Sequence, residues 1–227
     1  MEIYPIRINK YLALKGISTR RGADALIDGG KVFINGKKAA LGDKVNETDK
    51  VEVKGAEQKK YVYFIYNKPI GLQTEEIMDR LPKLKNLGVF PVGRIDKASH
   101  GLMLLTNDGR ITDRLLNPRF EHEKEYEVRV MGRLRSSFKD KMEKGVNIEG
   151  YKTKPCKVDV LDDDTFRVSL TEGKKHQIRR MCVALFQEVT DLKRIRVMNL
   201  KLGDLKQNQV REISGTELKK FLNLLAL

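Results

Sequence analysis

The sequence predicts an α+β protein in which a small N-terminal unit precedes a larger domain, built on a mixed, mainly antiparallel β-sheet with flanking helices. Two observations carry this prediction. Short helical and strand patterns separated by glycines fill residues 1–54, and strand and helix patterns intermix irregularly over residues 61–227. The polar segment GAEQKK lies between them. We therefore expect domains at 1–54 and 61–227, joined by a linker at 55–60.

The N-terminal unit begins with two helical patterns. INKYLALKG carries apolar side chains at helical spacing and stops at Gly16. STRRGADALIDGG begins with the candidate N-cap Ser18 and ends at Gly29 and Gly30. VFING then predicts a short strand that enters an Asn-Gly turn, and KVEV predicts another strand.

The larger domain contains alternating strand and helix patterns. Strands are predicted in YVYFIYNKP, GLMLLT, KEYEVRVMG, CKVDVL and TFRVSL, and the last alternates as a strand with one solvent-facing side should. Helices are predicted at residues 110–117, 136–144, 176–186 and 215–225. This irregular order is typical of an α+β domain rather than of repeated βαβ units.

The charge of the chain is strongly basic and unevenly distributed. There are 45 Lys and Arg against 31 Asp and Glu, a net charge of +14. Residues 7–38 alone hold eight basic and two acidic residues, which favours a nucleic-acid partner. No apolar run approaches the roughly 18 residues of a membrane span, and MEIYPIRINK does not resemble a signal peptide. We expect a cytoplasmic protein with no membrane partner.

The cysteines and histidines do not have the spacing of metal ligands. Cys156 and Cys182 form no CxxC or Cys/His pattern, and His100, His122 and His176 are far apart in the sequence. Two core thiols are therefore predicted, with no metal site.

Basic side chains of the N-terminal unit are candidates for RNA phosphate contacts. A solvated basic face is the alternative. The segment from Ile6 to Val45 resembles the S4 (αL-like) RNA-binding domain, with its basic first helix, a Ser/Thr-Arg-Arg step, and the G-x-V-x-V-N-G and G-D-x-V patterns. This resemblance favours RNA binding through Lys10, Arg20, Arg21, Lys31 and Lys37.

Residues 93–109, GRIDKASHGLMLLTNDG, place Asp96 directly before an apolar strand. On its own, such an aspartate is most simply a turn or cap residue. The whole run, however, resembles the pseudouridine synthase signature G-R-L-D-x-x-[TS]-x-G-L-[LM]-[LF]-[LF]-T-N-D-G. The resemblance implies that Asp96 is the nucleophile.

Further segments resemble the same family in the same order. EHEKEYEVRV resembles the K-x-Y segment, whose tyrosine packs on the target base, which implies this role for Tyr126. EGKKHQIRRM resembles the segment whose first basic residue pairs with the aspartate, which implies Arg179. In LKRIRVMNLKLGDL, the resemblance makes Ile195 a wall of the uracil pocket, although an ordinary core isoleucine is an equal alternative.

Together with the S4 unit, the resemblance covers nearly the whole chain. It indicates the RsuA-type branch and, within it, enzymes like RluF that act on large-subunit ribosomal RNA. Two departures stand out: Ser99-His100 replaces the commoner Thr-Ser, and Ala98 stands where an acid is frequent. We expect His100 to be structural or to contact RNA, rather than to be catalytic.

The implied reaction suits a carboxylate. Isomerising uridine breaks the bond between C1′ and N1, turns the uracil and joins C1′ to C5, so no metal or nucleotide cofactor is expected. A carboxyl group with a pKa near ~3.9 is ionised at neutral pH and needs no base. We expect Arg179 to pair with Asp96 and to oppose the effect of burial on its pKa. Arg180, about 100° away on a helix, would meet RNA or another acid.

The target base must leave its stack to be reached. Arg94 is a candidate either for the vacated place in the RNA or for a salt bridge. Lys68, in an N-K-P segment that also resembles the family, and Lys97 are candidates for RNA contact. Weaker candidates for the RNA channel, each also readable as a solvated surface charge, are Arg119, Lys124, Lys174 and Lys175.

The sequence thus favours a monomeric pseudouridine synthase that acts on ribosomal RNA, preferably 23S, free or in an assembling subunit. A 16S ribosomal RNA or a transfer RNA remains an alternative substrate. A non-catalytic RNA chaperone or ribosome-assembly factor would explain the charge and the S4 pattern, but not the three implied site residues. A hydrolase with an aspartate nucleophile lacks the second acid or base that it would need.

Overall fold

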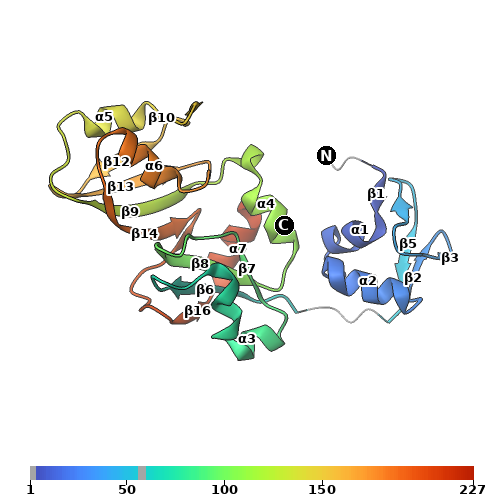
Figure 1. The fold of residues 1–227 in the computed structure, drawn as a ribbon. Coiled ribbons are helices and arrows are strands. Elements are labelled where there is room, and N and C mark those ends of the chain that lie inside the picture. The colour runs from blue at the N-terminus through green and yellow to red at the C-terminus, as the bar shows by residue number, and fades with distance from the viewer. Residues whose placement is uncertain (1–3, 56–59) are drawn as a thin grey trace.

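The computed structural model describes residues 4–55 and 60–227, apart from the side chain of Arg21. Residues 56–59 of the predicted linker lie outside this range. Figure 1 shows the N-terminal elements, in blue, as a body separate from a larger mixed α/β body. No described helix is long and apolar enough to cross a bilayer.

The N-terminal body packs two helices beside small sheets. β1 pairs with β4, and β2 is the centre of the sheet β3-β2-β5. The elements are β1 (Ile6–Arg7), α1 (Ile8–Leu14), α2 (Arg20–Asp28), β2 (Val32–Ile34), β3 (Lys37–Lys38), β4 (Lys44–Val45) and β5 (Val51–Val53). The predicted helices and strands are therefore confirmed. One detail was wrong: Thr19, not Ser18, caps α2, because its hydroxyl accepts a hydrogen bond from the Gly22 amide at 3.0 Å.

The larger body is built on a nine-stranded sheet whose main path has the order β12-β13-β9-β14-β8-β6-β16. All pairings are antiparallel except β14 with β8, which confirms the predicted fold class. The strands are β6 (Tyr63–Lys68), β7 (Phe90–Val92), β8 (His100–Thr106), β9 (Lys124–Val130), β12 (Lys157–Val160), β13 (Thr165–Leu170), β14 (Val189–Val197), β15 (Leu200–Lys201) and β16 (Val210–Glu212). A separate hairpin is formed by β10 (Asn147–Ile148) and β11 (Tyr151–Lys152).

All four helices predicted for this body are present. They are α4 (Arg110–Leu116), α5 (Phe138–Glu143), α6 (Gln177–Ala184) and α7 (Gly215–Leu224). The sequence analysis missed α3 (Pro82–Asn86) and the 3₁₀ segments η1 (Thr74–Asp79) and η2 (Pro118–Phe120). These elements are too short to show helical periodicity.

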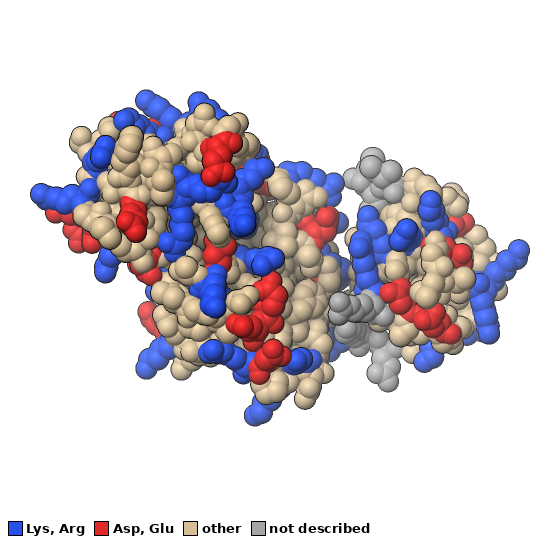
Figure 2. All heavy atoms as spheres, in the orientation of Figure 1, with Lys and Arg blue, Asp and Glu red and all other residues tan. Residues whose placement is uncertain are grey.

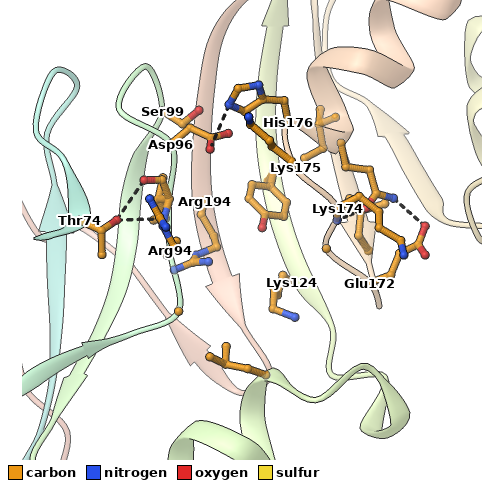
Figure 3. Close-up of a pocket in the computed structure, with 18 of the residues that line it drawn as sticks. Thr74, Arg94, Asp96, Ser99, Lys124, Glu172, Lys174, Lys175, His176 and Arg194 are labelled. Carbon is orange, nitrogen blue, oxygen red and sulfur yellow. Dashed lines mark hydrogen bonds and ion pairs between the residues drawn. The ribbon is translucent and has the colours of Figure 1, made fainter. Parts of the chain in front are cut away.

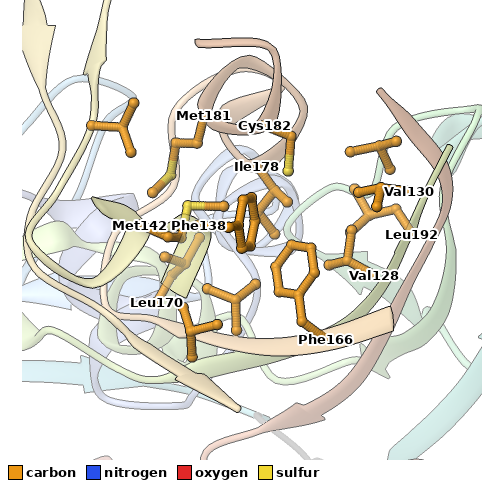
Figure 4. Packing of buried hydrophobic residues seen from close by; sticks show 14 of the residues in the cluster. Val128, Val130, Phe138, Met142, Phe166, Leu170, Ile178, Met181, Cys182 and Leu192 are labelled. Atoms are coloured by element: carbon orange, nitrogen blue, oxygen red, sulfur yellow. The ribbon is translucent and has the colours of Figure 1, made fainter. Parts of the chain in front are cut away.

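A hydrophobic core beneath α5 and α6 fixes one side of the functional site. Phe138 and Phe166 meet edge to face, with ring centroids 4.8 Å apart and planes at 62°. Ile178 and Cys182 of α6 pack against the same cluster (Figure 4). Burial raises the pKa of the Cys182 thiol to about 12 and that of Cys156 to about 11. Both cysteines are free, as predicted. Because these contacts anchor α6 to the core, the C-terminal end of the loop that precedes α6 is held in place.

One contact links the N-terminal body to the larger one. The Tyr61 hydroxyl donates to the Gly16 carbonyl, and the Arg110 guanidinium lies 4.5 Å from the centroid of the Tyr61 ring. Arg110 is held in turn by two bonds, of 2.9 and 2.8 Å, to the fully buried Asp108 carboxylate. The contact therefore reaches from the end of α1 to the start of α4.

Candidate active site

A cleft of about 880 Å³ opens in the larger body, a volume that suits a ligand the size of a nucleotide. Its floor comes from β9 and β14, and its walls come from the segments 93–99 and 171–178 together with the end of α4. Figure 2 shows basic side chains gathered around this hollow. The cleft lining also includes two of the three residues predicted to be catalytic, Asp96 and Tyr126, but not Arg179.

The turn that carries Asp96 is held from several sides. The Thr74 hydroxyl donates to the Ile95 carbonyl at 3.1 Å and lies 3.3 Å from the Ile95 amide. The Ser99 amide donates to the Asp96 carbonyl at 3.0 Å, which closes the turn. The Asp96 side chain keeps 40% of its surface exposed and points into the cleft (Figure 3). A carboxylate held on a fixed backbone yet open to a ligand is suitable for nucleophilic attack.

His176 faces Asp96 across the cleft. Its Nε2 lies 3.4 Å from Oδ1 of Asp96, and Figure 3 shows the two side chains directed toward each other. The backbone of His176 is left-handed, with φ 51°, where the chain turns into α6. The sequence analysis did not give His176 this role. The signal was the H-Q step in EGKKHQIRRM, which Ile178 separates from the arginine pair.

The loop that presents His176 is secured by a buried carboxylate. Glu172 accepts hydrogen bonds from the Tyr151 hydroxyl, the Lys154 amide at 3.0 Å and Nε2 of Gln177 at 2.7 Å. Burial alone would raise the pKa of Glu172, but these hydrogen bonds outweigh burial and lower it. The Lys174 amide donates to Oε1 of Gln177 at 2.8 Å, which closes the loop.

Arg179 lies beside the Asp96 turn but does not form the predicted ion pair. Its Nη2 donates to the Ala98 carbonyl at 2.9 Å and to Oγ of Ser99 at 3.4 Å, and its Nη1 donates to the Val189 carbonyl at 3.0 Å. Within the described residues, the basic side chain in contact with the Asp96 carboxylate is His176. The direct pairing of Asp96 with Arg179 was therefore wrong for this structure. The guanidinium instead ties the turn after Asp96 to the start of β14.

Arg180 points away from the cleft, as its helical position predicts. Its Nη2 lies 2.7 Å from Oε2 of Glu149. The two predicted partners of Arg180 were RNA and another acid, and the structure shows an acid, Glu149.

A row of residues crosses the centre of the sheet at the floor of the cleft. Strand register aligns Lys68 of β6 with Gly101 of β8, Gly101 with Arg194 of β14, and Arg194 with Tyr126 of β9. Gly101 has φ 105°, and a Cβ there would lie 2.3 Å from the Arg194 carbonyl oxygen. Glycine is thus required where β8 and β14 approach each other. The row places Tyr126 directly beside a buried arginine.

Lys68 was expected to contact RNA, and the structure corrects this. Its side chain is fully buried, outside the cleft lining, and its Nζ donates to the carbonyls of Pro69 at 3.0 Å and Leu72 at 2.7 Å. Burial lowers the pKa of Lys68 to about 8, although the negative charge of Asp96 opposes this shift. Lys68 therefore stabilises the turn that follows β6, whose Gly71 amide donates to the Lys97 carbonyl at 2.8 Å.

Ile195 does not line the cleft. It lies at an irregularity in the pairing of β14 with β9, between Arg194 and Arg196, and is only partly buried. Leu170, Ile178 and Leu192 supply apolar lining instead. Successive side chains of a strand point to opposite faces, so Ile195 does not share the cleft-facing position of its neighbour Arg194.

The remaining candidates lie at the rim of the cleft or on the N-terminal body. Arg94 is 80% exposed and pairs with Glu75 at 3.0 Å. Of the two alternatives for Arg94, the vacated place in the RNA or a salt bridge, this structure shows the salt bridge. His100 is buried, with Nε2 2.9 and 3.1 Å from the Asp191 carboxylate oxygens, which is a structural role.

Lys97 is exposed at the mouth of the cleft, and Lys10, Arg20, Lys31 and Lys37 are exposed on the N-terminal body. The side chain of Arg21 lies outside the described atoms.

Two cations of the floor were not selected as catalytic from the sequence. They are Lys124 of β9 and Arg194 of β14, which face the cleft beside Tyr126. Alternation along β9 places Lys124 and Tyr126 on one side of the sheet. The alternation in KEYEVRV predicts that these two residues share a face of the strand. LKRIRVMN has no such alternation, so its pattern did not reveal that Arg194 is buried.

Comparison with known proteins defines the class. Residues 58–184 match the family described as RNA pseudouridylate synthase, and residues 6–51 match the S4 domain. The chain belongs to the RNA pseudouridine synthase family, in the RsuA-type group with an N-terminal S4 domain. It is accordingly an RNA-binding isomerase.

Individual relatives span most of the chain. The dual-specificity RNA pseudouridine synthase RluF of Escherichia coli K12 is 38% identical, over 97% of this chain and 79% of its own. The ribosomal large subunit pseudouridine synthase B of Bacillus subtilis is 36% identical, over 94% of both chains. A crystal structure of a pseudouridylate synthase matches with a TM-score of 0.71 and 25% identity, over 97% of this chain and 99% of that one.

Proposed function

We propose that this protein converts a specific uridine of ribosomal RNA, with 23S RNA favoured, to pseudouridine, and that Asp96 is the nucleophile. The observation that carries the proposal is the position of Asp96: a partly exposed carboxylate on a pinned turn, in a cleft of nucleotide size shared with Tyr126. The names of the relatives from Escherichia coli and Bacillus subtilis support uridine in RNA as the substrate.

Each residue of the cleft has a role in this proposal. Tyr126 stacks on the flipped uracil between the apolar side chains of Ile178 and Leu192. Arg179 positions Asp96 by holding the carbonyl of Ala98. Arg94 exchanges its exposed pairing with Glu75 for contacts with the RNA, which is inexpensive because exposed ion pairs contribute little stability.

The N-terminal body delivers the RNA in this proposal. We assign residues 1–54 to the S4 domain and 61–227 to the catalytic domain, with the protein acting as a monomer. The exposed cations Lys10, Arg20, Lys31 and Lys37 supply affinity through phosphates rather than sequence choice. Alternatives for the substrate are 16S ribosomal RNA and transfer RNA.

The test is a map of pseudouridines in total RNA from strains with and without the gene, by chemical adduct formation and reverse transcription. We expect one or a few 23S uridines to lose their signal in the deletion strain and to regain it with the wild-type gene. An unchanged map in both strains would support the alternative of a non-catalytic RNA chaperone or assembly factor. A lost site in 16S or transfer RNA would redirect the substrate assignment.

A further inference from the structure

The floor of the cleft holds two cations that lack a carboxylate partner. Among the described residues, no ion pair includes Lys124 or Arg194, whereas Arg196 two residues along β14 binds both Glu123 and Glu125. Arg194 is only 6% exposed. A buried charge without a partner is costly, so this pair of cations needs an explanation beyond stability.

The hydrogen bonds of Arg194 leave one end of its guanidinium free. Nε donates to the Leu102 carbonyl at 2.8 Å, and Nη2 lies 3.9 Å from the Met103 sulfur. Nη1 has no partner within the described part of the chain. Arg194 and Lys124 both line the cleft, and Figure 3 shows the Arg194 guanidinium on the side of Arg94, with Lys124 farther along the floor. The first two contacts fix the guanidinium in the wall of the cleft, which Arg194 helps to line.

Lys124 lies close to Arg194 and adds a second positive charge. Among the described residues, its Nζ donates one hydrogen bond, of 3.2 Å, to the His122 carbonyl. Burial lowers the pKa of Lys124, and the charge of Arg194 lowers it further. Both residues line the same cleft, so an anion bound there would offset both positive charges.

The position of these cations favours the base over a phosphate. Arg194 is the cross-strand neighbour of Tyr126, the proposed stacking partner of the uracil, and the adjoining wall is apolar. Phosphates are better served at the rim, where Arg94, Lys97 and Lys174 are exposed. A neutral uracil gains little from one buried and one half-buried cation, but a uracil that becomes negative during the reaction is stabilised by both.

Given the proposed function, we infer that Arg194, assisted by Lys124, binds the uracil ring oxygens and stabilises the negative charge that the ring acquires when its bond to the ribose breaks. Asp96 Oδ forms a bond to C1′ while the electron pair of the C1′–N1 bond stays on the ring. After the ring turns, C5 bonds to C1′ and the carboxylate leaves with its electron pair. The proton on C5 then moves to N1, so the product is an isomer of the substrate.

The test compares single-turnover rates and RNA affinities of Arg194→Met, Arg194→Lys and Lys124→Met on one modified RNA. Because the interaction is strongest in the transition state, we expect Arg194→Met to lower the rate by about 10²–10³-fold, with RNA affinity within about threefold of wild type. Lys124→Met should lose less, and Arg194→Lys should recover part of the rate. Lys193→Met, on the same strand but the other face, is the matched control.

A second substrate separates charge stabilisation from misfolding. Fluorine at C5 makes the uracil anion more stable by itself, so the defect of Arg194→Met should be smaller on RNA with 5-fluorouridine at the target. Because the fluorinated ring has no C5 proton to move to N1, the rate compared on both RNAs is that of C1′–N1 bond cleavage. An equal defect on both RNAs, or a loss confined to affinity and its salt dependence, would overturn the inference; the latter would indicate a phosphate contact. Asp96→Asn supplies the inactive reference. If Asp96→Asn is inactive and Arg194→Met reacts normally, the proposed function stands and this inference fails.

Discussion

At the scale of single residues, the reactive carboxylate is defined by the backbone around it. Asp96 sits on a turn whose neighbours Ile95, Lys97 and Ala98 each have a bonded carbonyl. The sequence could identify Asp96 and Tyr126, because each lies in a local motif of fixed spacing. It could not show that Arg179 binds the carbonyl of Ala98, because that contact joins residues 81 positions apart.

Arg179 should act through position rather than through charge pairing. We expect Arg179→Ala to lower kcat by about 10²-fold, since a shift of about 1 Å in a reacting group has this effect. RNA affinity should change little, and Arg179→Lys should recover only part of the rate. Arg180→Ala, which removes the ion pair with the exposed Glu149 one residue along, is the control. A normal kcat for Arg179→Ala would remove Arg179 from the site.

Lys68 should make stability depend on pH. Its pKa is about 8 in the folded protein and ~10.4 in an unfolded chain, so between these values the unfolded state binds more protons. Burying protonated Lys68 therefore lowers the free energy of unfolding by at most about 3 kcal/mol below pH 8. This loss disappears as the pH rises from about 8 to about 10.4. Urea unfolding of wild type and Lys68→Met across this range measures the difference. Parallel curves for the two proteins would contradict the assignment.

At the scale of elements, strands with apolar alternation were predictable and the central charged strand was not. TFRVSL forms β13 with alternating buried and exposed residues. β14, VTDLKRIRV, is the longest strand, yet five of its nine residues are polar or charged. Its partners β8 and β9 cover both edges, and its charged side chains bind distant acids and carbonyls, so local pattern could not reveal it.

Gly101 provides a test of the central strand pairing. In Gly101→Ala, the new Cβ would lie 2.3 Å from the Arg194 carbonyl oxygen, at a backbone φ of 105°. We expect a loss of more than about 2 kcal/mol of unfolding free energy, measured by urea denaturation. Gly88→Ala also has positive φ, but nothing within 4 Å of its new Cβ, and should cost only about 1 kcal/mol. Equal losses would show that β8 and β14 are not so close.

At the scale of the whole molecule, charge is divided between affinity and chemistry. The exposed cations of the N-terminal body are far in the sequence from the cleft and do not contribute to its lining. The net charge of +14 could predict a polyanionic partner. It could not separate the surface cations from the cleft cations Lys124 and Arg194, because burial depends on the sheet.

The N-terminal cations should affect binding alone. We expect the double substitution Lys10→Gln and Arg20→Gln to weaken RNA binding about tenfold and to reduce the slope of log affinity against log salt by about one to two. The single-turnover rate at saturating enzyme should remain that of wild type. A fall in this rate, with affinity unchanged, would mean that the N-terminal body takes part in the chemistry.

The central claim is that the carboxylate of Asp96 attacks the target nucleoside. Asp96→Asn keeps the shape of the side chain and removes its charge. With a modified RNA identified by mapping, the direct measurement is pseudouridine formation by the purified variant, alongside its RNA affinity. The account predicts affinity within about threefold of wild type, the range expected for one uncharged substitution in a multivalent interface, and no detectable product. Product formation near the wild-type rate would contradict it.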